Sequence, residues 1–268
     1  MKKKILAICV VAILVITAIA GASLAYLTDT DEADNVFTVG NVQIELVEQQ
    51  REYDDDGNLT GLGDFEPNKV LLPLVGSAQG AKDKYGMPTA ANYVDKIINI
   101  KSIGASNAYV RVYMAVPAVL DNVGSSATNI LHFNIGNKFD AEGKAEGQEN
   151  VANADYAECW GEETLVAKSV DIGEVVCNVY SYTYLKSLAK DEITDYAAVV
   201  GFYLDSKVDN KMVDGKIVYT MNGKEIDYDF AQGVTIPVYA IGVQADGFAN
   251  ATDALDAAFG TGYNPWAN

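Results

Sequence analysis

One ten-residue stretch, Ala108 to Pro117, limits the fold of this 268-residue chain more than any other. Its even positions carry apolar residues: Val110, Val112, Met114 and Val116. Its odd positions carry a second substantial set: Tyr109, Arg111, Tyr113 and Ala115. Because side chains alternate between the two faces of a strand, this stretch needs cover on both sides. It therefore predicts a central strand of a β-sandwich.

Much of the remaining chain also alternates with the two-residue period of strands. Asn222-Gly223 is the turn dipeptide of a type I′ hairpin, whose two central residues both need positive φ, and it joins strands predicted at 217–221 and 224–228. The other predicted strands are 37–46 with a bulge at Gly40-Asn41, 70–75 at an edge because of Pro73, 94–100, 130–135, 164–170, 174–185, 200–204 and 234–244 with an edge or bulge at Pro237. The sequence thus predicts an all-β chain.

Helical patterns are few and short. Near the C-terminus, Thr252 is a suitable N-cap, Leu255 and Phe259 are spaced i and i+4, and Gly260 can end the helix. We expect this helix to form a lid over one end of the sandwich. Residues 191–199 are compatible with a short helical turn.

Residues 51–64 are rich in glycine and aspartate and are predicted to be a connection. A calcium loop is the alternative, because placing Gly57 at the sixth position of an EF-hand loop puts acidic residues at its first ligand positions. The twelfth position, however, is Gly63 where that motif needs a bidentate glutamate. A solvated turn is therefore favoured, although acidic loops can still bind calcium weakly. The connections at 85–91 and 137–153 are also predicted to be loops.

The N-terminus has the parts of a secretory signal peptide. Lysines at 2–4 precede an uncharged apolar run from Ile5 to Ala20. Ser23 and Ala25 then place small residues at the two positions that a signal peptidase reads. We expect cleavage after Ala25, so that the secreted chain begins at Tyr26.

Two alternatives to this cleavage remain. Cleavage after Ala22 would also follow a small residue. An uncleaved anchor is the other, because the apolar run up to residue 25 approaches the ~20 residues that span a bilayer. Acidic residues, not a basic stop-transfer cluster, follow it.

Charge limits the partners that the secreted chain can have. The whole chain has a net charge of −18, and loss of the three leader lysines makes it −21, because all acidic residues lie beyond residue 25. Nucleic acid is therefore not expected as a partner, since binding it requires a basic surface. Cys159 and Cys177 are the cysteines left after cleavage, too few for a disulfide framework. A single bridge between them suits an extracellular protein, and the sequence leaves its formation open.

The stretch AYLTDTDEADNVFTVGNVQIEL, from Ala25 to Leu46, resembles the start of the TasA/camelysin family, secreted proteins of Gram-positive bacteria with SipW-type signal peptides. Two weaker similarities are NIKSIGASNAYVRVYMAV at 99–116 and YAIGVQADGFANATDALDAAF at 239–259. The resemblance implies a jelly-roll-like β-sandwich that polymerises into extracellular fibres of a biofilm matrix. It also implies partners: further copies of the chain, other matrix proteins or the cell surface. Camelysin-like members are reported as surface proteases.

These observations divide the chain into a signal peptide at 1–25, an N-terminal arm at 26–36 and a single sandwich domain at 37–268. The arm is too polar to belong to a core, and five of its residues are assigned to self-assembly: Tyr26, Leu27, Thr28, Asp29 and Val36. Extended at ~3.3 Å per residue, it can reach the sheet edge of another copy. The resemblance implies that it acts there as a donor strand. The alternative is an acidic tail without a partner.

Catalytic motifs are missing from the sequence, and we expect no enzyme, no metal site and no cofactor. His132 is the only histidine and is predicted to face solvent, so neither a two-histidine zinc site nor a histidine-based triad can form around it. Tyr180, Tyr182 and Tyr184 share one strand face, as a carbohydrate-stacking platform would need, but a structural role for them is favoured. The hypotheses are thus a fibre subunit, a monomeric adhesin or glycan-binding module and, on kinship alone, a camelysin-like protease.

Overall fold

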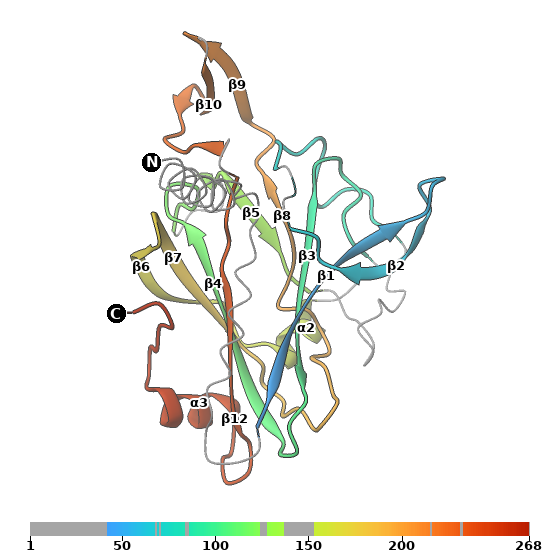
Figure 1. Cartoon of the computed structure of the whole chain (residues 1–268), viewed down its shortest axis with the longest axis vertical. Coiled ribbons are helices and arrows are strands. Elements are labelled where there is room, and N and C mark those ends of the chain that lie inside the picture. The colour runs from blue at the N-terminus through green and yellow to red at the C-terminus, as the bar shows by residue number, and fades with distance from the viewer. Residues whose placement is uncertain are drawn as a thin grey trace, which may run out of the picture.

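Antiparallel pairing organises the described part of the chain into two large sheets and a small one, as the computed structural model shows (Figure 1). The structure describes residues 42–67, 69, 71–83, 86–123, 128–136, 153–214, 216–230 and 233–267. One sheet has the order β2-β1-β3-β8-β5: β1 is Ile44–Tyr53, β2 Leu59–Asp64, β3 Val94–Ser102, β5 Leu131–Asn134 and β8 Val199–Leu204. The second has the order β12-β4-β7-β6: β4 is Ala108–Pro117, β6 Thr164–Ile172, β7 Val175–Thr183 and β12 Val238–Gln244.

A smaller third sheet has the order β11-β10-β9, with β9 at Val208–Val213, β10 at Lys216–Met221 and β11 at Lys224–Glu225. Asn222 and Gly223 both have positive φ, 53° and 77°, so the predicted hairpin turn is confirmed. Two short helices complete the described part: α2 at Asn153–Cys159 and α3 at Ala251–Phe259. The predicted fold class, an all-β sandwich with few helices and one of them near the C-terminus, is confirmed.

The main core lies between the two large sheets. The even-numbered side chains of β4 point into it and are almost completely buried: Val110, Val112, Met114 and Val116. β4 pairs with β12 on one side and β7 on the other, so its predicted central position is confirmed. Full burial of one such aliphatic side chain contributes about 1.5–3 kcal/mol, which makes β4 a principal source of stability.

The outer face of the four-stranded sheet is also covered. Tyr113 and Ala115 of β4 pack there against Ala254 and Leu255 of α3. The helix therefore lies on the outer face of this sheet, and the expected lid over one end is wrong. Its N-cap is Asn250, whose side chain accepts a hydrogen bond from the Asp253 N–H at 2.9 Å, so the cap assigned to Thr252 is two residues too late.

Several predicted connections and elements need correction. Residues 51–64 are not simply a loop, because β1 and β2 pair there as a hairpin around a turn at 54–58. The 70–75 stretch makes isolated bridges at Pro73 and Val75 in place of a strand, and 191–199 contains no helical turn. β9 was not predicted. The predicted bulge at Gly40-Asn41 and most of the 137–153 loop lie outside the described residues.

Candidate functional site

The predicted cleavage site and self-assembly arm lie outside the described residues: Ser23, Ala25, Tyr26, Leu27, Thr28, Asp29 and Val36. The described residues begin at Val42, which is buried. The Gln43 carbonyl accepts hydrogen bonds from the backbone N–H groups of Ile103 and Gly104 at 2.9 and 3.0 Å. The start of the described chain therefore lies beside the loop between β3 and β4.

A glycine makes this junction fit. A Cβ on Gly242 of β12 would lie 3.0 Å from Ile44 Cγ2 and 3.3 Å from Val42 Cγ1, closer than most side-chain contacts. The start of β1 thus packs tightly over β12 and bridges the two large sheets. We call this end of the molecule the arm pole (Figure 1). It comprises residues 42–44, the β3–β4 loop at 103–107 and the β12–α3 loop at 245–250. A hydrogen bond from Ala245 N to Asn107 O joins the two loops.

The opposite end of the long axis carries the projecting hairpin of β9 and β10 (Figure 1). A groove of about 740 Å³ lies at the base of this hairpin. Its apolar lining includes Leu120, Ile130, Met221 and Ile226. We call this end the hairpin pole. The two poles therefore differ in shape, because one presents loops and the other a groove beside a projection.

The two cysteines do not form the bridge that the sequence left open. Both are free, buried thiols. Cys159 belongs to the main core, whereas Cys177 belongs to the cluster under α3 on the outer face of the four-stranded sheet. Burial raises the pKa of Cys177 to about 11, so its thiol stays protonated at neutral pH.

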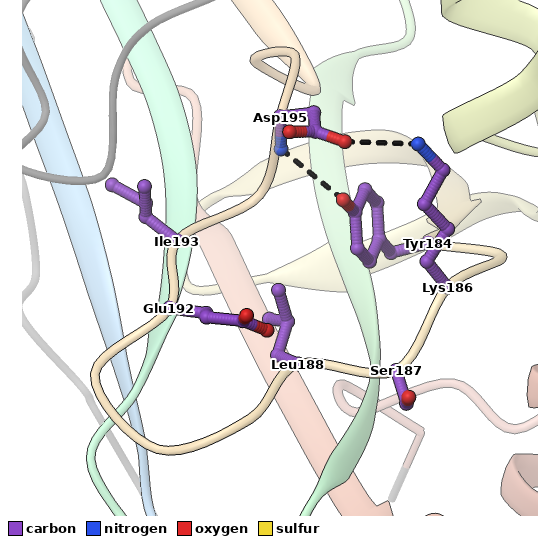
Figure 2. Close-up of a pocket in the computed structure, with 7 residues that line it drawn as sticks. All are labelled: Tyr184, Lys186, Ser187, Leu188, Glu192, Ile193 and Asp195. Carbon is purple, nitrogen blue, oxygen red and sulfur yellow. Dashed lines mark hydrogen bonds and ion pairs between the residues drawn. The ribbon is translucent and has the colours of Figure 1, made fainter.

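Lys186 and Asp195 form an ion pair at a cavity of about 320 Å³ (Figure 2), and the Asp195 carboxylate also lies near Cys159. The Cys159 Sγ is 3.8 Å from Asp195 Oδ2, and the same oxygen accepts a hydrogen bond from Lys186 Nζ at 2.9 Å. Burial raises the pKa of the Cys159 thiol, and the hydrogen bond to Asp195 raises the pKa of Lys186. Neither group is activated as a nucleophile, because that requires a lowered pKa.

The prediction that His132 faces solvent is wrong. Its Nε2 lies 3.1 Å from Asp205 Oδ2, and its ring stacks on Tyr203 with centroids 5.0 Å apart. The side chains of His132 and Asp205 are both mostly buried. Their contact holds β5 against the connection between β8 and β9. No described serine or cysteine side chain is bonded to this pair, and it therefore has no nucleophile to serve.

The tyrosine row of β7 points into the main core. Tyr180, Tyr182 and Tyr184 are all buried, which confirms the structural role and removes these rings from carbohydrate stacking. Their hydroxyls are satisfied inside the sandwich: Tyr180 donates to Asp121 and Tyr182 donates to Glu163. Burial is the main cause that raises the pKa of Glu163, which lies beside this row.

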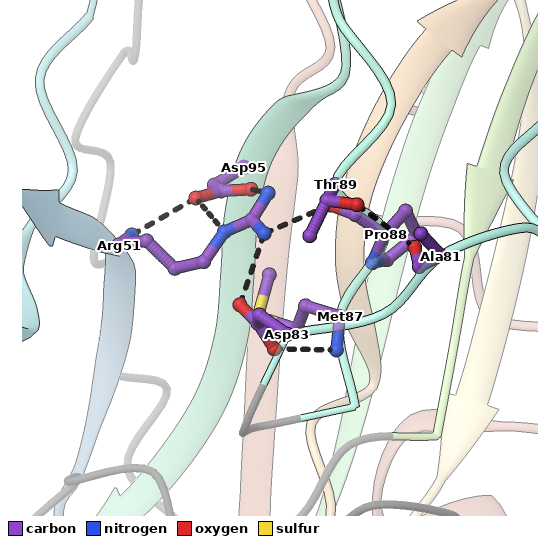
Figure 3. A network of polar contacts seen from close by, with 7 residues as sticks. All are labelled: Arg51, Ala81, Asp83, Met87, Pro88, Thr89 and Asp95. Atoms are coloured by element: carbon purple, nitrogen blue, oxygen red, sulfur yellow. Dashed lines mark hydrogen bonds and ion pairs between the residues drawn. The ribbon is translucent and has the colours of Figure 1, made fainter. Parts of the chain in front are cut away.

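The most extensive buried charge network lies on the outer face of the five-stranded sheet (Figure 3). Arg51 of β1 binds Asp95 of β3 through two hydrogen bonds, Nε to Oδ2 at 2.8 Å and Nη2 to Oδ1 at 2.7 Å. Its Nη1 donates to Asp83 at 3.1 Å and to the Pro88 carbonyl at 2.8 Å. Burial by itself would lower the pKa of Arg51, but these carboxylates outweigh it and the pKa is raised.

This network has a structural use. It fastens the 81–89 loop over a small apolar cluster that includes Met87, Ile97 and Val200. Each of the three guanidinium nitrogens donates to a protein acceptor, through four hydrogen bonds in all. Sequence patterns gave no signal for it, because Arg51 and its two aspartates are separated by more than thirty residues.

Within the described ranges, no three histidine, cysteine, aspartate or glutamate side chains gather closely enough to hold a metal ion. In that part of the chain, no helix is both long and apolar enough to cross a bilayer. The two poles and the sheet edges are parts of the described surface that another protein chain can contact.

Comparison with known proteins gives no family for this chain: no family model, no curated protein and no solved structure matches it.

Proposed function

We propose that this chain is a secreted structural subunit that assembles head to tail into extracellular fibres of a biofilm matrix. In this proposal, cleavage after Ala25 frees the arm at 26–36, and the arm of one copy adds a strand to a sheet edge of the next. The chain acts by binding other copies of itself and carries out no reaction. Other matrix proteins or the cell surface of a Gram-positive bacterium are its further partners.

One structural observation carries the proposal: the described part of the sandwich begins at one pole of the long axis. The hydrogen bonds of Gln43 to the β3–β4 loop fix that starting point. An arm that starts at a pole can extend away from its own sandwich towards the next one along the axis. A head-to-tail contact of this kind repeats without closing and produces a filament.

The sheets supply edges for such an arm. The edge strands of the two large sheets are β2 and β5 in one and β12 and β6 in the other. An edge strand has unpaired backbone N–H and C=O groups, and an incoming strand can satisfy them. β12 is preceded by Pro237, which cannot donate a backbone hydrogen bond and is typical of an edge position.

The competing hypotheses receive less support. The glycan-binding hypothesis depended on the tyrosine row, which is buried. The protease hypothesis depends on kinship alone. Among the described residues no serine or cysteine is bonded to His132, and burial raises the pKa of both thiols. A structural role uses what the described residues offer, namely a rigid sandwich with open edges.

The test is to delete residues 26–35 from the mature protein. The starting material is protein from culture medium whose intact mass shows that it begins at Tyr26. A matched control replaces the same ten residues with a glycine-serine stretch of equal length. We expect both variants to remain folded monomers by circular dichroism and light scattering, and to form no fibres in electron microscopy, whereas the wild type does.

Undiminished fibre growth by the deletion variant would rule out the arm as the connecting element. Failure of the wild-type mature protein to form fibres over a range of pH and time would contradict the proposed function as a whole. A secreted protein whose mass still includes residues 1–25 would show that cleavage does not free the arm.

A further inference from the structure

The outer face of the four-stranded sheet is only partly filled by α3. A pocket of about 400 Å³ remains there, which is within the usual size range of small-molecule sites. The strands contribute Arg111 of β4, Thr183 of β7 and Thr164 of β6 to its lining. Asp256 of α3 and residues 261–263 after this helix line it as well. The pocket is therefore built from segments that lie far apart in the sequence.

A charged pair is fixed at the surface of this pocket. The Arg111 side chain is only 9% exposed. Its Nε donates a hydrogen bond to Thr183 Oγ1 at 2.8 Å, and its Nη1 donates to Asp256 Oδ1 at 3.0 Å. Thr261 Oγ1 donates to the other Asp256 oxygen at 3.3 Å. These contacts hold a guanidinium group and a carboxylate side by side, so the hydroxyl groups of one ligand can accept from the first and donate to the second.

The pocket also contains a hydroxyl group that the protein leaves unused. Ser181 of β7 lines the pocket and is only 6% exposed. In the described part of the chain, its side chain makes no hydrogen bond. Because buried polar side chains nearly always have a partner, Ser181 is available for one that a ligand supplies. The Thr183 hydroxyl accepts from Arg111 and keeps its own proton for donation.

Charge and polarity select the kind of ligand. Glu162 and Asp256 bring two carboxylates to the pocket against the one guanidinium group of Arg111, so an anionic ligand would be repelled. Leu165 and Tyr263 add apolar surface to the lining. A sugar ring has hydroxyl groups at its edge and C–H groups on its faces, and it therefore matches a lining that combines hydrogen-bonding and apolar groups.

We propose that this pocket binds a single neutral sugar unit. Arg111 and Ser181 donate hydrogen bonds to oxygen atoms of the sugar, and Asp256 accepts from its hydroxyl groups. The pocket is separate from the tyrosine row, which points into the main core from the other face of β7. The proposal goes beyond fibre assembly and does not depend on it, because one folded copy contains the whole pocket.

The first experiment measures sugar binding by the mature protein before it assembles. The probes are the methyl glycosides of glucose, galactose, mannose and N-acetylglucosamine, together with the corresponding free sugars. Saturation-transfer NMR identifies the sugar that binds, and isothermal titration calorimetry gives its Kd, which we expect in the millimolar range for a single unit. Binding of a glycoside assigns the pocket to the end of a glycan chain, whereas binding of free sugars alone assigns it to a free sugar.

The second experiment removes hydrogen-bonding groups while keeping the shape of the pocket. Ser181→Ala should keep the wild-type urea unfolding curve, because the hydroxyl has no protein partner, and should raise the Kd about fivefold. Asp256→Asn replaces a charged acceptor by a neutral one and should raise the Kd about tenfold or more. Ser206→Ala is the matched control, since Ser206 is exposed in the turn between β8 and β9, and its Kd should equal that of the wild type.

Two outcomes would overturn the proposal. One is that none of these sugars binds the mature protein. The other is a Kd that is the same in the wild type, Ser181→Ala and Asp256→Asn, because the sugar would then bind elsewhere. Neither outcome affects the fibre function, and a mature protein that forms no fibres can still be tested for sugar binding, so the two proposals fail separately.

Discussion

The outer faces of the two large sheets are covered in two different ways. The five-stranded sheet holds its covering loop through Arg51, whose guanidinium group binds two carboxylates and a carbonyl while its side chain is only 5% exposed. The four-stranded sheet is covered by α3 through apolar contacts, with Leu255 and Ala254 completely buried. The first face depends on charges that must all be present, and the second depends on packed volume. The two faces should therefore fail under different perturbations.

The largest effect is expected when the arginine is removed. Arg51→Met removes the buried cation that Asp83 and Asp95 share, and breaking a buried ion pair on one side costs about 3–5 kcal/mol of unfolding free energy. Urea denaturation measures this loss. The triple variant Arg51→Met/Asp83→Asn/Asp95→Asn removes all three charges of the network. It should recover more than half of the unfolding free energy that Arg51→Met loses.

Two results would contradict this explanation of the charged face. A loss below about 1 kcal/mol in Arg51→Met would show that the network contributes little. A triple variant as unstable as the single one would show that lost packing of the arginine stem, not unpaired carboxylates, causes the effect.

Truncation of a central side chain under α3 should cost somewhat less unfolding free energy. Leu255→Ala removes a fully buried leucine from the helix–sheet contact, and such truncations cost about 2–5 kcal/mol depending on how far the cavity collapses. Leu72→Ala is the matched control, because Leu72 is partly exposed, and it should cost under about 0.5 kcal/mol. Equal losses from both leucines in urea denaturation would mean that α3 is only loosely attached.

The smallest expected effect is a change in how the unfolding free energy depends on alkaline pH. It involves the face covered by α3 and not the face held by Arg51. The pKa of Cys177, beneath α3, is raised by burial from 9.0 to about 11. The unfolded chain releases this proton first as pH rises, so the native state holds more protons between pH 9 and 11 and its stability declines across that window. Cys177→Ala should show a shallower decline in unfolding free energy over the same range.

Arg51→Met is the control for this pH series. The pKa of Arg51 is raised, so its guanidinium group stays charged throughout the window and the variant should keep the wild-type slope. Parallel curves for wild type and Cys177→Ala would show that the thiol does not couple folding to pH.

The parts of the fold that sequence predicted well are those where local preference and tertiary contacts agree. Asn222-Gly223 specifies its turn by itself, and the residues of β4 alternate on both faces because both faces are buried. β2 was missed because its sequence LTGLGD favours a loop, yet pairing with β1 makes it a strand. β9, with the sequence VDNKMV, was missed for the same reason. In both, the partner strand overrides weak local propensity.

The candidate site was less predictable than the fold. Alternation shows which residues share a face but not which helix packs on it, so the pocket beside Arg111 and Asp256 requires the three-dimensional structure. The same holds for His132, whose alternating position indicated solvent but whose partner Asp205 comes from a distant part of the chain. The arm at 26–36 stays a prediction from sequence alone.

The pairing of β4 with β12 has a consequence for the order of events in the cell. Ala108 is opposite Gln244, so this central strand cannot gain one of its two neighbours until nearly the whole polypeptide has been synthesised. Sheets that depend on such distant pairings fold slowly, because a long loop must close before any contact compensates for the lost entropy. A nascent chain with this topology stays open during translation. In a secreted protein, such a delay keeps the polypeptide unfolded until it has passed through an export channel.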